Sequence, residues 1–140
     1  MRKILVISGI LFLIGTLIAL FIIMKQLHKP HIDIYATDPD ITISINTLLN
    51  DYNIDEKKAN QKYLDKVIQT EGIIKKIDTN NGNTLILITE KNTSNSVVCY
   101  MEPFENKKVL TLEVGQSIKV KGICTGFLMD VVLVRTIIIH

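Results

Sequence analysis

The feature that most constrains this 140-residue chain is an uncharged apolar run near its N-terminus, from Ile4 to Met24. The run is 21 residues long and contains no Asp, Glu, Lys, Arg or His. About 20 such residues cross a hydrocarbon core of roughly 30 Å as a helix, which satisfies its own backbone hydrogen bonds in lipid. The sequence therefore predicts one N-terminal transmembrane helix, with residues 1–27 forming a membrane anchor.

A cleaved secretory signal peptide is the alternative interpretation of this run. Such a signal has a shorter apolar region, roughly 7–15 residues, followed by a cleavage site of small residues. Here no Ala-x-Ala sequence follows the run, and no Cys near its end marks a lipoprotein cleavage site. We therefore expect an uncleaved anchor.

The charge balance changes once the anchor is set aside. Four of the 16 basic residues flank the apolar run, namely Arg2, Lys3, Lys25 and Lys29. The rest of the chain contains the other 12 basic residues and all 14 acidic residues, so its net charge is about −2. Phosphate contacts dominate nucleic-acid affinity, and this balance therefore disfavours nucleic acid as a partner.

The flanking charges also bear on topology. Two basic residues precede the run and two follow it, which comes close to a tie under the positive-inside rule. The short N-terminus favours an N-in orientation. We therefore expect the soluble domain on the extracytoplasmic, periplasmic side of a single-pass membrane protein.

Helical signals follow the anchor. Residues 28–39 contain two prolines and predict a linker. Apolar side chains then recur at helical spacing from Ile41 to Tyr52, which predicts a short amphipathic helix. Asp55 suits the N-cap of a second helix over residues 56–64.

From residue 66 onward the pattern becomes that of β-strands. The expected strands are β-branched or alternating and cover residues 66–77, 84–90, 96–101, 116–126 and 131–139. The stretch Asn80–Asn83 is a strong hairpin signal between the first two strands, and Pro103 to Val114 has room for a short helix. Gly72 and Gly122 suit a small barrel whose strands must bend. The sequence thus predicts a mainly β fold, with two short helices before a five-stranded barrel in a domain over residues 40–140.

Residues spread over most of this domain resemble a known family. The chain is similar to the bacterial tRNA-anticodon-like OB-fold family of membrane proteins and lipoproteins of unknown function. The residues that carry the resemblance are Ala59, Tyr63, Lys66, Val67, Ile68, Gly72, Ile74, Val98, Cys99, Tyr100, Gly115, Gln116, Ser117, Ile118, Val120, Gly122, Cys124, Gly126, Phe127, Asp130, Val131 and Leu133. The resemblance spans residues 42 to 139. It implies an OB barrel behind an export or membrane signal, and it supplies no catalytic site.

The two cysteines are Cys99 and Cys124. Two are too few for a disulfide scaffold, and their spacing does not fit a zinc site. They fall on strands that are not neighbours in an OB barrel, although two inward side chains can still meet across a small barrel. Buried free thiols are the favoured interpretation, and a disulfide in an oxidising compartment is the alternative.

The basic side chains on the predicted strands form a candidate ligand face, made of Lys75, Lys76, Lys119 and Lys121. Lys119 and Lys121 share the outer face of one strand, and OB order places the first strand beside it. OB domains that bind single strands combine such a groove with stacking aromatic side chains. No strand here interleaves the two residue types, so a solvated face is the favoured interpretation.

The sequence predicts no catalytic, cofactor or metal site. The histidines are His28, His31 and His140, two in the linker and one at the C-terminus, and none lies beside a nucleophile. Asp130 follows a turn and is expected to cap it. We therefore expect a protein that is not an enzyme.

Three functional hypotheses remain open on the sequence. The favoured one is a membrane-anchored, non-catalytic OB module that binds a protein, peptide or small ligand. The first alternative is an OB domain that binds single-stranded nucleic acid. The second is a structural accessory subunit of a membrane complex. The sequence does not fix the oligomeric state.

Overall fold

The computed structural model describes residues 13–21, 33–80, 82–91 and 93–139. The chain divides into two units, Met1–Ile32 and Asp33–His140. In the first unit, residues 13–21 are helical, and the rest of the predicted span 4–24 lies outside the described residues. No helix of the described part is long and apolar enough to cross a membrane, so the predicted transmembrane helix is not confirmed.

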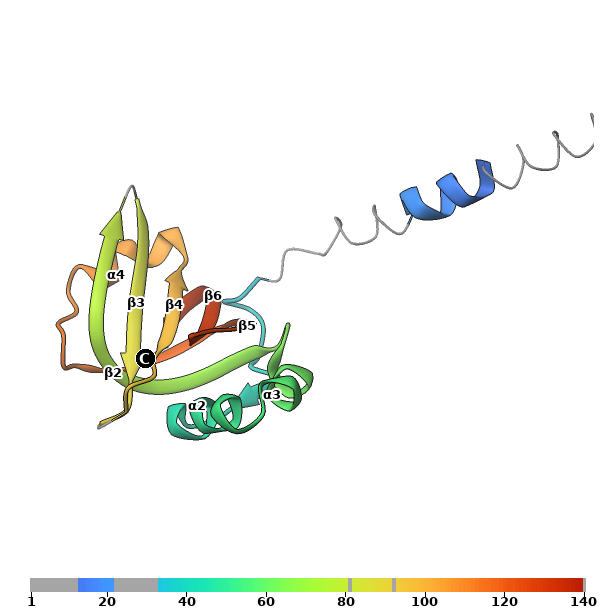
Figure 1. The fold of residues 1–140 in the computed structure, drawn as a ribbon. Coiled ribbons are helices and arrows are strands. Elements are labelled where there is room, and N and C mark those ends of the chain that lie inside the picture. The colour runs from blue at the N-terminus through green and yellow to red at the C-terminus, as the bar shows by residue number, and fades with distance from the viewer. Residues whose placement is uncertain (1–12, 22–32, 81, 92, 140) are drawn as a thin grey trace, which may run out of the picture. The chain divides into compact units, whose positions relative to one another are not determined.

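The second unit is a closed β-barrel (Figure 1). Its five strands are β2 (Val67–Asn80), β3 (Asn83–Thr89), β4 (Val97–Met101), β5 (Ser117–Leu128) and β6 (Asp130–Ile139). They follow the order β2-β3-β4-β6-β5, and β2 closes the barrel by pairing with β5. Only β4 and β6 run parallel among these five. The mainly β, five-stranded barrel predicted from the sequence is therefore confirmed.

The first helix begins later than predicted. Ile41–Thr42 form a short strand, β1, which pairs in parallel with β2, and helix α2 covers Ile45–Ile54. Ser44 ends the extended segment because its Oγ accepts a hydrogen bond from the backbone N–H of Thr47 at 3.2 Å and caps α2. The apolar spacing that includes Ile41 was therefore wrong as a helical signal, since β-branched residues precede the cap and favour extended backbone.

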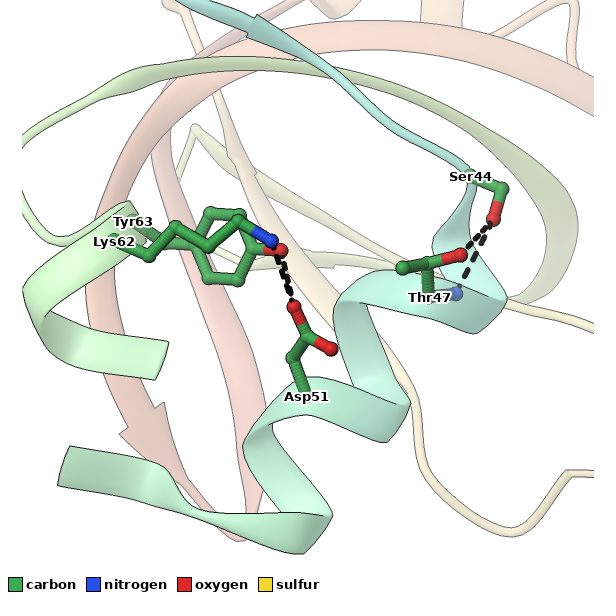
Figure 2. Close-up of polar contacts among 5 residues, drawn as sticks. All are labelled: Ser44, Thr47, Asp51, Lys62 and Tyr63. Carbon is green, nitrogen blue, oxygen red and sulfur yellow. Dashed lines mark hydrogen bonds and ion pairs between the residues drawn. The ribbon is translucent and has the colours of Figure 1, made fainter. Parts of the chain in front are cut away.

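Helix α3 (Glu56–Tyr63) begins at the predicted cap, because the Asp55 carboxylate accepts a hydrogen bond from the N–H of Lys58 at 3.0 Å. Figure 2 shows how α3 is fixed to α2. The hydroxyl of Tyr63 donates to Oδ2 of Asp51 at 2.5 Å, and the Lys62 amine reaches the same oxygen at 3.0 Å. These hydrogen bonds hold the Asp51 pKa below its usual range.

The two helices close one end of the barrel and complete its core. Tyr52 of α2 stacks on Phe127 of β5, with ring centroids 5.6 Å apart. Tyr63 is fully buried beside them. Tyr52 also places its hydroxyl 3.4 Å from Sγ of Cys124. Burial of these rings removes a large apolar surface from water.

Both predicted glycine positions are sites of close approach. The β5–β6 register shifts between Lys121 and Ile123, which places a bulge at Gly122. A Cβ there would lie 2.6 Å from Oγ1 of Thr136. At Gly72 a Cβ would lie 2.8 Å from Cδ1 of Ile45. Only glycine therefore fits the bends without displacing its neighbours.

The remaining connections agree with the expected turns. Asn80 pairs with Asn83 across the β2–β3 hairpin, and Gly82 has a φ of +80°. The connection between β4 and β5 contains the 3₁₀ turn η1 (Pro103–Glu105) and the short helix α4 (Asn106–Val109). The amide of Asn106 donates to the carbonyl of Gly82 at 3.0 Å. The hairpin tip and α4 therefore lie together at the end of the barrel opposite α2 and α3 (Figure 1).

The described part of the predicted linker packs on the barrel as a strap, residues 33–40, cyan in Figure 1. Ile34 is fully buried, and the Tyr35 hydroxyl donates to Oε1 of Glu105 at 2.7 Å. At the other end of the strap, the Asp40 carboxylate accepts from the N–H of Val67 at 2.8 Å. The barrel unit therefore begins at Asp33, before the expected domain start at residue 40.

Candidate ligand face

The structure places both cysteine side chains in the core as free thiols. Cys99 on β4 and Cys124 on β5 each pair with Leu133 on β6, the strand between them. Two strand spacings separate their Cα atoms by roughly 9–10 Å, whereas a disulfide requires less than about 7 Å. Burial raises the pKa of the Cys99 thiol to about 12, which keeps it protonated and unreactive.

Lys119 and Lys121 follow each other on the outer side of β5 but have different surroundings. Lys121 is only 6% exposed because the strap covers it, and its amine donates to the carbonyl of Thr37 at 2.7 Å. Lys119 is exposed and lies opposite Glu71 of β2. The Lys121 amine therefore binds the strap, and only the Lys119 amine is open to solvent.

The other two lysines of the predicted face lie beyond the β2–β5 pairing. The Lys75 amine donates to the Ser94 carbonyl and to the Ser96 hydroxyl, each at 3.3 Å. Lys76 pairs with Asp78 at 2.9 Å. The structure therefore does not gather the four amines into one basic groove.

Asp130 was expected to cap its own turn, but its carboxylate binds a distant strand instead. Its Oδ1 accepts a hydrogen bond from the N–H of Ser96 at 2.8 Å and so joins the β5–β6 turn to the start of β4. His140, like His28 and His31, lies outside the described residues. Within the described ranges, no group of three or more His, Cys, Asp and Glu side chains could hold a metal ion.

A different surface, the outer side of β3 and β4, emerges from the register. Leu85 lies opposite Tyr100 and Leu87 lies opposite Val98, so these four side chains point the same way. Tyr100 is 48% exposed, which identifies this side as the outer one, while Ile86 between the two leucines is fully buried. We call these four residues the β3–β4 face.

The polar groups beside the β3–β4 face are amides, a hydroxyl and paired charges. A hollow of about 360 Å³ next to Tyr100 is lined by Leu85 and by the polar residues Asp78, Asn80, Asn83 and Thr84. Asp78 is paired with Lys76, and on the far side of β4 Arg135 binds Glu102 at 2.7 Å. The face therefore offers apolar contact, one aromatic ring and neutral hydrogen-bonding groups.

Sequence reasoning did not single out this face, although a signal was present. The stretch Leu85–Ile88 is apolar at every position, whereas a strand with one solvated face should alternate. Ile86 and Ile88 fill the core, so Leu85 and Leu87 are the surplus apolar residues. An uninterrupted apolar run on a strand of a small barrel thus indicates an apolar outer surface.

Comparisons with known proteins identify a family and proteins of similar structure. The model of the tRNA_anti-like family matches residues 1–138. A Klebsiella pneumoniae lipoprotein, described as a proposed nucleic acid-binding protein, has a similar structure with a TM-score of 0.64 and 17% identity, over 80% of this chain and 100% of that chain. A proposed aspartyl-tRNA synthetase from Leishmania major Friedlin gives a TM-score of 0.48 and 10% identity, over 78% of this chain and 22% of that chain. No curated protein matches significantly.

Proposed function

The chain belongs to the tRNA_anti-like family, and from this premise we propose that it is a non-catalytic OB module that binds its ligand across the β3–β4 face. In the proposal, the apolar run of residues 4–24 tethers the module to a membrane, with the barrel on the extracytoplasmic side. OB barrels bind chain-like ligands on the second and third strands of the barrel, which are β3 and β4 here.

The half-exposed apolar surface of β3 and β4 is the observation that carries the proposal. Leu85, Leu87 and Val98 are partly exposed around Tyr100, although an ordinary solvated strand would present polar side chains there. Other parts of the barrel surface are covered by the chain itself, since the strap covers Lys121 of β5 and the two helices close one end of the barrel. An apolar outer surface in this position suits a ligand that removes it from water.

The chemistry of the face favours an extended polypeptide as the ligand. Aliphatic side chains such as Leu87 and Val98 provide apolar contacts, and Asn80 and Asn83 beside Tyr100 can hydrogen-bond to a peptide backbone. The nearby charges are already paired as Lys76–Asp78 and Glu102–Arg135. A ligand that needs many free cations gains little from such a surface.

Support for the tether comes from the sequence and from one similar protein. The run of residues 4–24 is uncharged and long enough to span a bilayer, and the described part of it, residues 13–21, is helical. The similar Klebsiella protein is described as a lipoprotein. A reporter that is active on only one side of the membrane, fused after His140, tests the orientation. Activity on the cytoplasmic side would contradict the extracytoplasmic location.

The ligand proposal is tested by panning a random 12-residue peptide display library against the full chain in lipid nanodiscs. We expect the selected peptides to bind the wild type and to lose affinity for Tyr100→Ala and Leu87→Lys. Lys57→Ala is the matched control, because Lys57 is exposed on α3, away from the face. Equal binding to the wild type and to all three variants would place the ligand elsewhere and contradict the proposal.

Single-stranded nucleic acid is the second candidate, favoured by one specific observation. Tyr100 is an exposed ring on the strand pair that OB folds use for ligands, and bases stack on such rings. The description of the Klebsiella protein names nucleic acid as its proposed ligand. A fluorescein-labelled single-stranded DNA dodecamer, titrated in low and high salt, separates the candidates. Binding that weakens with salt and is lost in Tyr100→Ala would favour nucleic acid over peptide.

A further inference from the structure

The connection between β4 and β5 exposes three large apolar side chains to solvent. Phe104 is 82% exposed, Leu110 81% and Val114 66%, and we call these three residues the apolar rim. The same connection buries Glu105 and Val109 against the barrel. The exposed apolar side chains therefore do not belong to the barrel core, and they need another explanation.

The strap begins at the same end of the barrel as the apolar rim. Tyr35 donates to Oε1 of Glu105, the residue after Phe104, and Oε2 of Glu105 accepts from the N–H of Ile138 near the end of β6. Here β4 and β6 end and β5 begins, next to α4. The barrel unit therefore begins close to Glu105 and to its neighbour Phe104, the first residue of the rim.

The length of the chain that precedes Asp33 limits how far this end can lie from the apolar run. Residues 25–32 separate Met24 from Asp33 and reach about 30 Å at full extension. The strap is fixed at both ends, by Glu105 at Tyr35 and by Val67 at Asp40, so it adds no slack. If the run of residues 4–24 lies in a bilayer, Asp33 lies within about 30 Å of its surface.

We propose that Phe104, Leu110 and Val114 insert into the interfacial region of the bilayer that holds the chain's own apolar run. The proposal rests on the proposed membrane tether. The charges between the rim residues balance, since Lys107 and Lys108 are matched by Glu105 and Glu113 and Lys108 pairs with Glu105 at 3.0 Å. Insertion therefore depends on buried apolar area rather than on anionic lipid. In this orientation α4 and the neighbouring tip of the β2–β3 hairpin lie toward the lipid surface, and the Leu87–Val98 part of the β3–β4 face lies further from it.

The opposite end of the barrel provides a matched control. Leu128 is 82% exposed at the β5–β6 turn, as exposed as Phe104. That turn lies with α2 and α3, away from the strap's first residues, because the β5–β6 ladder ends there at Leu128 and Asp130. Phe104 and Leu128 are thus equally exposed, and they differ in how close they lie to the start of the strap, where the proposed tether joins the barrel.

The chain contains no Trp, so a single introduced indole reports its own surroundings. Full-length Phe104→Trp and Leu128→Trp are reconstituted separately at low protein-to-lipid ratio into phosphatidylcholine vesicles with brominated acyl chains. We expect Trp at position 104 to emit at shorter wavelength and to lose most of its intensity to bromine quenching, unchanged by anionic lipid or high salt. Trp at position 128 should keep a solvent-like spectrum. Leu110→Trp provides a second rim position if Phe104→Trp fails to fold.

Flotation of the same samples on a density gradient separates failure of this inference from failure of the tether. Chains that float but show no greater quenching at positions 104 and 110 than at 128 would overturn the insertion and leave the tether standing. Chains that stay at the bottom would overturn both proposals. A blue shift without bromine quenching would indicate a protein or a second copy on the rim, and would also overturn insertion into lipid.

Discussion

The hydroxyl of Tyr35 donates a 2.7 Å hydrogen bond to Oε1 of Glu105, a residue 70 positions further along the chain. Burial and this hydrogen bond raise the pKa of Tyr35 to about 12. Glu105 is almost fully buried, and it also accepts from the Lys108 amine at 3.0 Å and from the backbone N–H of Ile138 at 3.3 Å. A single buried carboxylate thus joins the strap, α4 and the last strand.

Loss of the Glu105 charge should destabilise the barrel unit. Glu105→Gln keeps the shape but weakens three charge-assisted hydrogen bonds, so we expect a loss of about 1.5–3 kcal/mol in the free energy of unfolding. Tyr35→Phe removes only one hydrogen bond and should cost about 1 kcal/mol. Urea denaturation monitored by circular dichroism measures both. Glu113→Gln, at an exposed carboxylate, is the control and should stay within about 0.5 kcal/mol of wild type.

The same carboxylate should give the protein part of its acid sensitivity. Burial by itself would raise the pKa of Glu105, but the hydrogen bonds from Tyr35, Lys108 and Ile138 outweigh it and hold the pKa below its usual range. An unfolded Glu has a pKa of about 4.3. The contribution of Glu105 is therefore fully present above that pH and is lost as the pH falls toward the lower pKa of the folded state. Urea midpoints measured from pH 6 to pH 3 should fall more steeply in wild type than in Glu105→Gln, and parallel curves would contradict this assignment.

The strands were predictable because their signals are local. Alternation, the Asn80–Asn83 turn and the glycines at the bends are readable within a few residues of each strand. The start of the first helix was not, because Ile41 suits a helical spacing and a strand equally well. Whether Ile41 joins a helix or a strand depends on its pairing with Ile68, which is distant in sequence.

The candidate ligand face was less predictable, because exposure depends on packing between distant segments. The alternation on β5 correctly places Lys119 and Lys121 on the outer side, yet the strap then covers Lys121. No local pattern indicates that residues 33–40 return to that strand, since the two prolines in the linker favour a loose connection. In the sequence Tyr100 stands out only among the residues that carry the family resemblance, and its position opposite Leu85 follows from the register alone.

Both cysteine thiols should be free, and both should react slowly in the native state. Chain purified without reductant and then unfolded in guanidinium chloride should give two free thiols with Ellman's reagent, because Cys99 and Cys124 are free and lie two strands apart. In the native state, both should react slowly at pH 8, since both side chains are fully buried. Dithiothreitol should leave the melting temperature unchanged. A count of zero thiols in denaturant would show a disulfide and contradict the strand register.

Gly122 and Thr136 should be energetically coupled. A Cβ at position 122 would lie 2.6 Å from Oγ1 of Thr136, which is buried and has no hydrogen-bond partner among the described residues. Gly122→Ala should therefore destabilise the barrel by about 1–3 kcal/mol through overpacking. Thr136→Ala removes the crowding atom without breaking a hydrogen bond, so the double variant should be more stable than the sum of the single changes predicts, by about 0.5–3 kcal/mol.

A second double-mutant cycle, which combines Gly72→Ala with Thr136→Ala, provides the matched control. An added Cβ at position 72 would meet Ile45, Ile88 and the carbonyl of Thr89, none of which is Thr136. Gly72→Ala should also destabilise the barrel, but its effect should add to that of Thr136→Ala within about 0.5 kcal/mol because the two sites share no contact. Urea denaturation of the six proteins, wild type included, measures both cycles. Additivity in the Gly122 cycle would show that the added methyl group clashes with Cβ of Leu133 and the carbonyl of Val134 rather than with the side chain of Thr136.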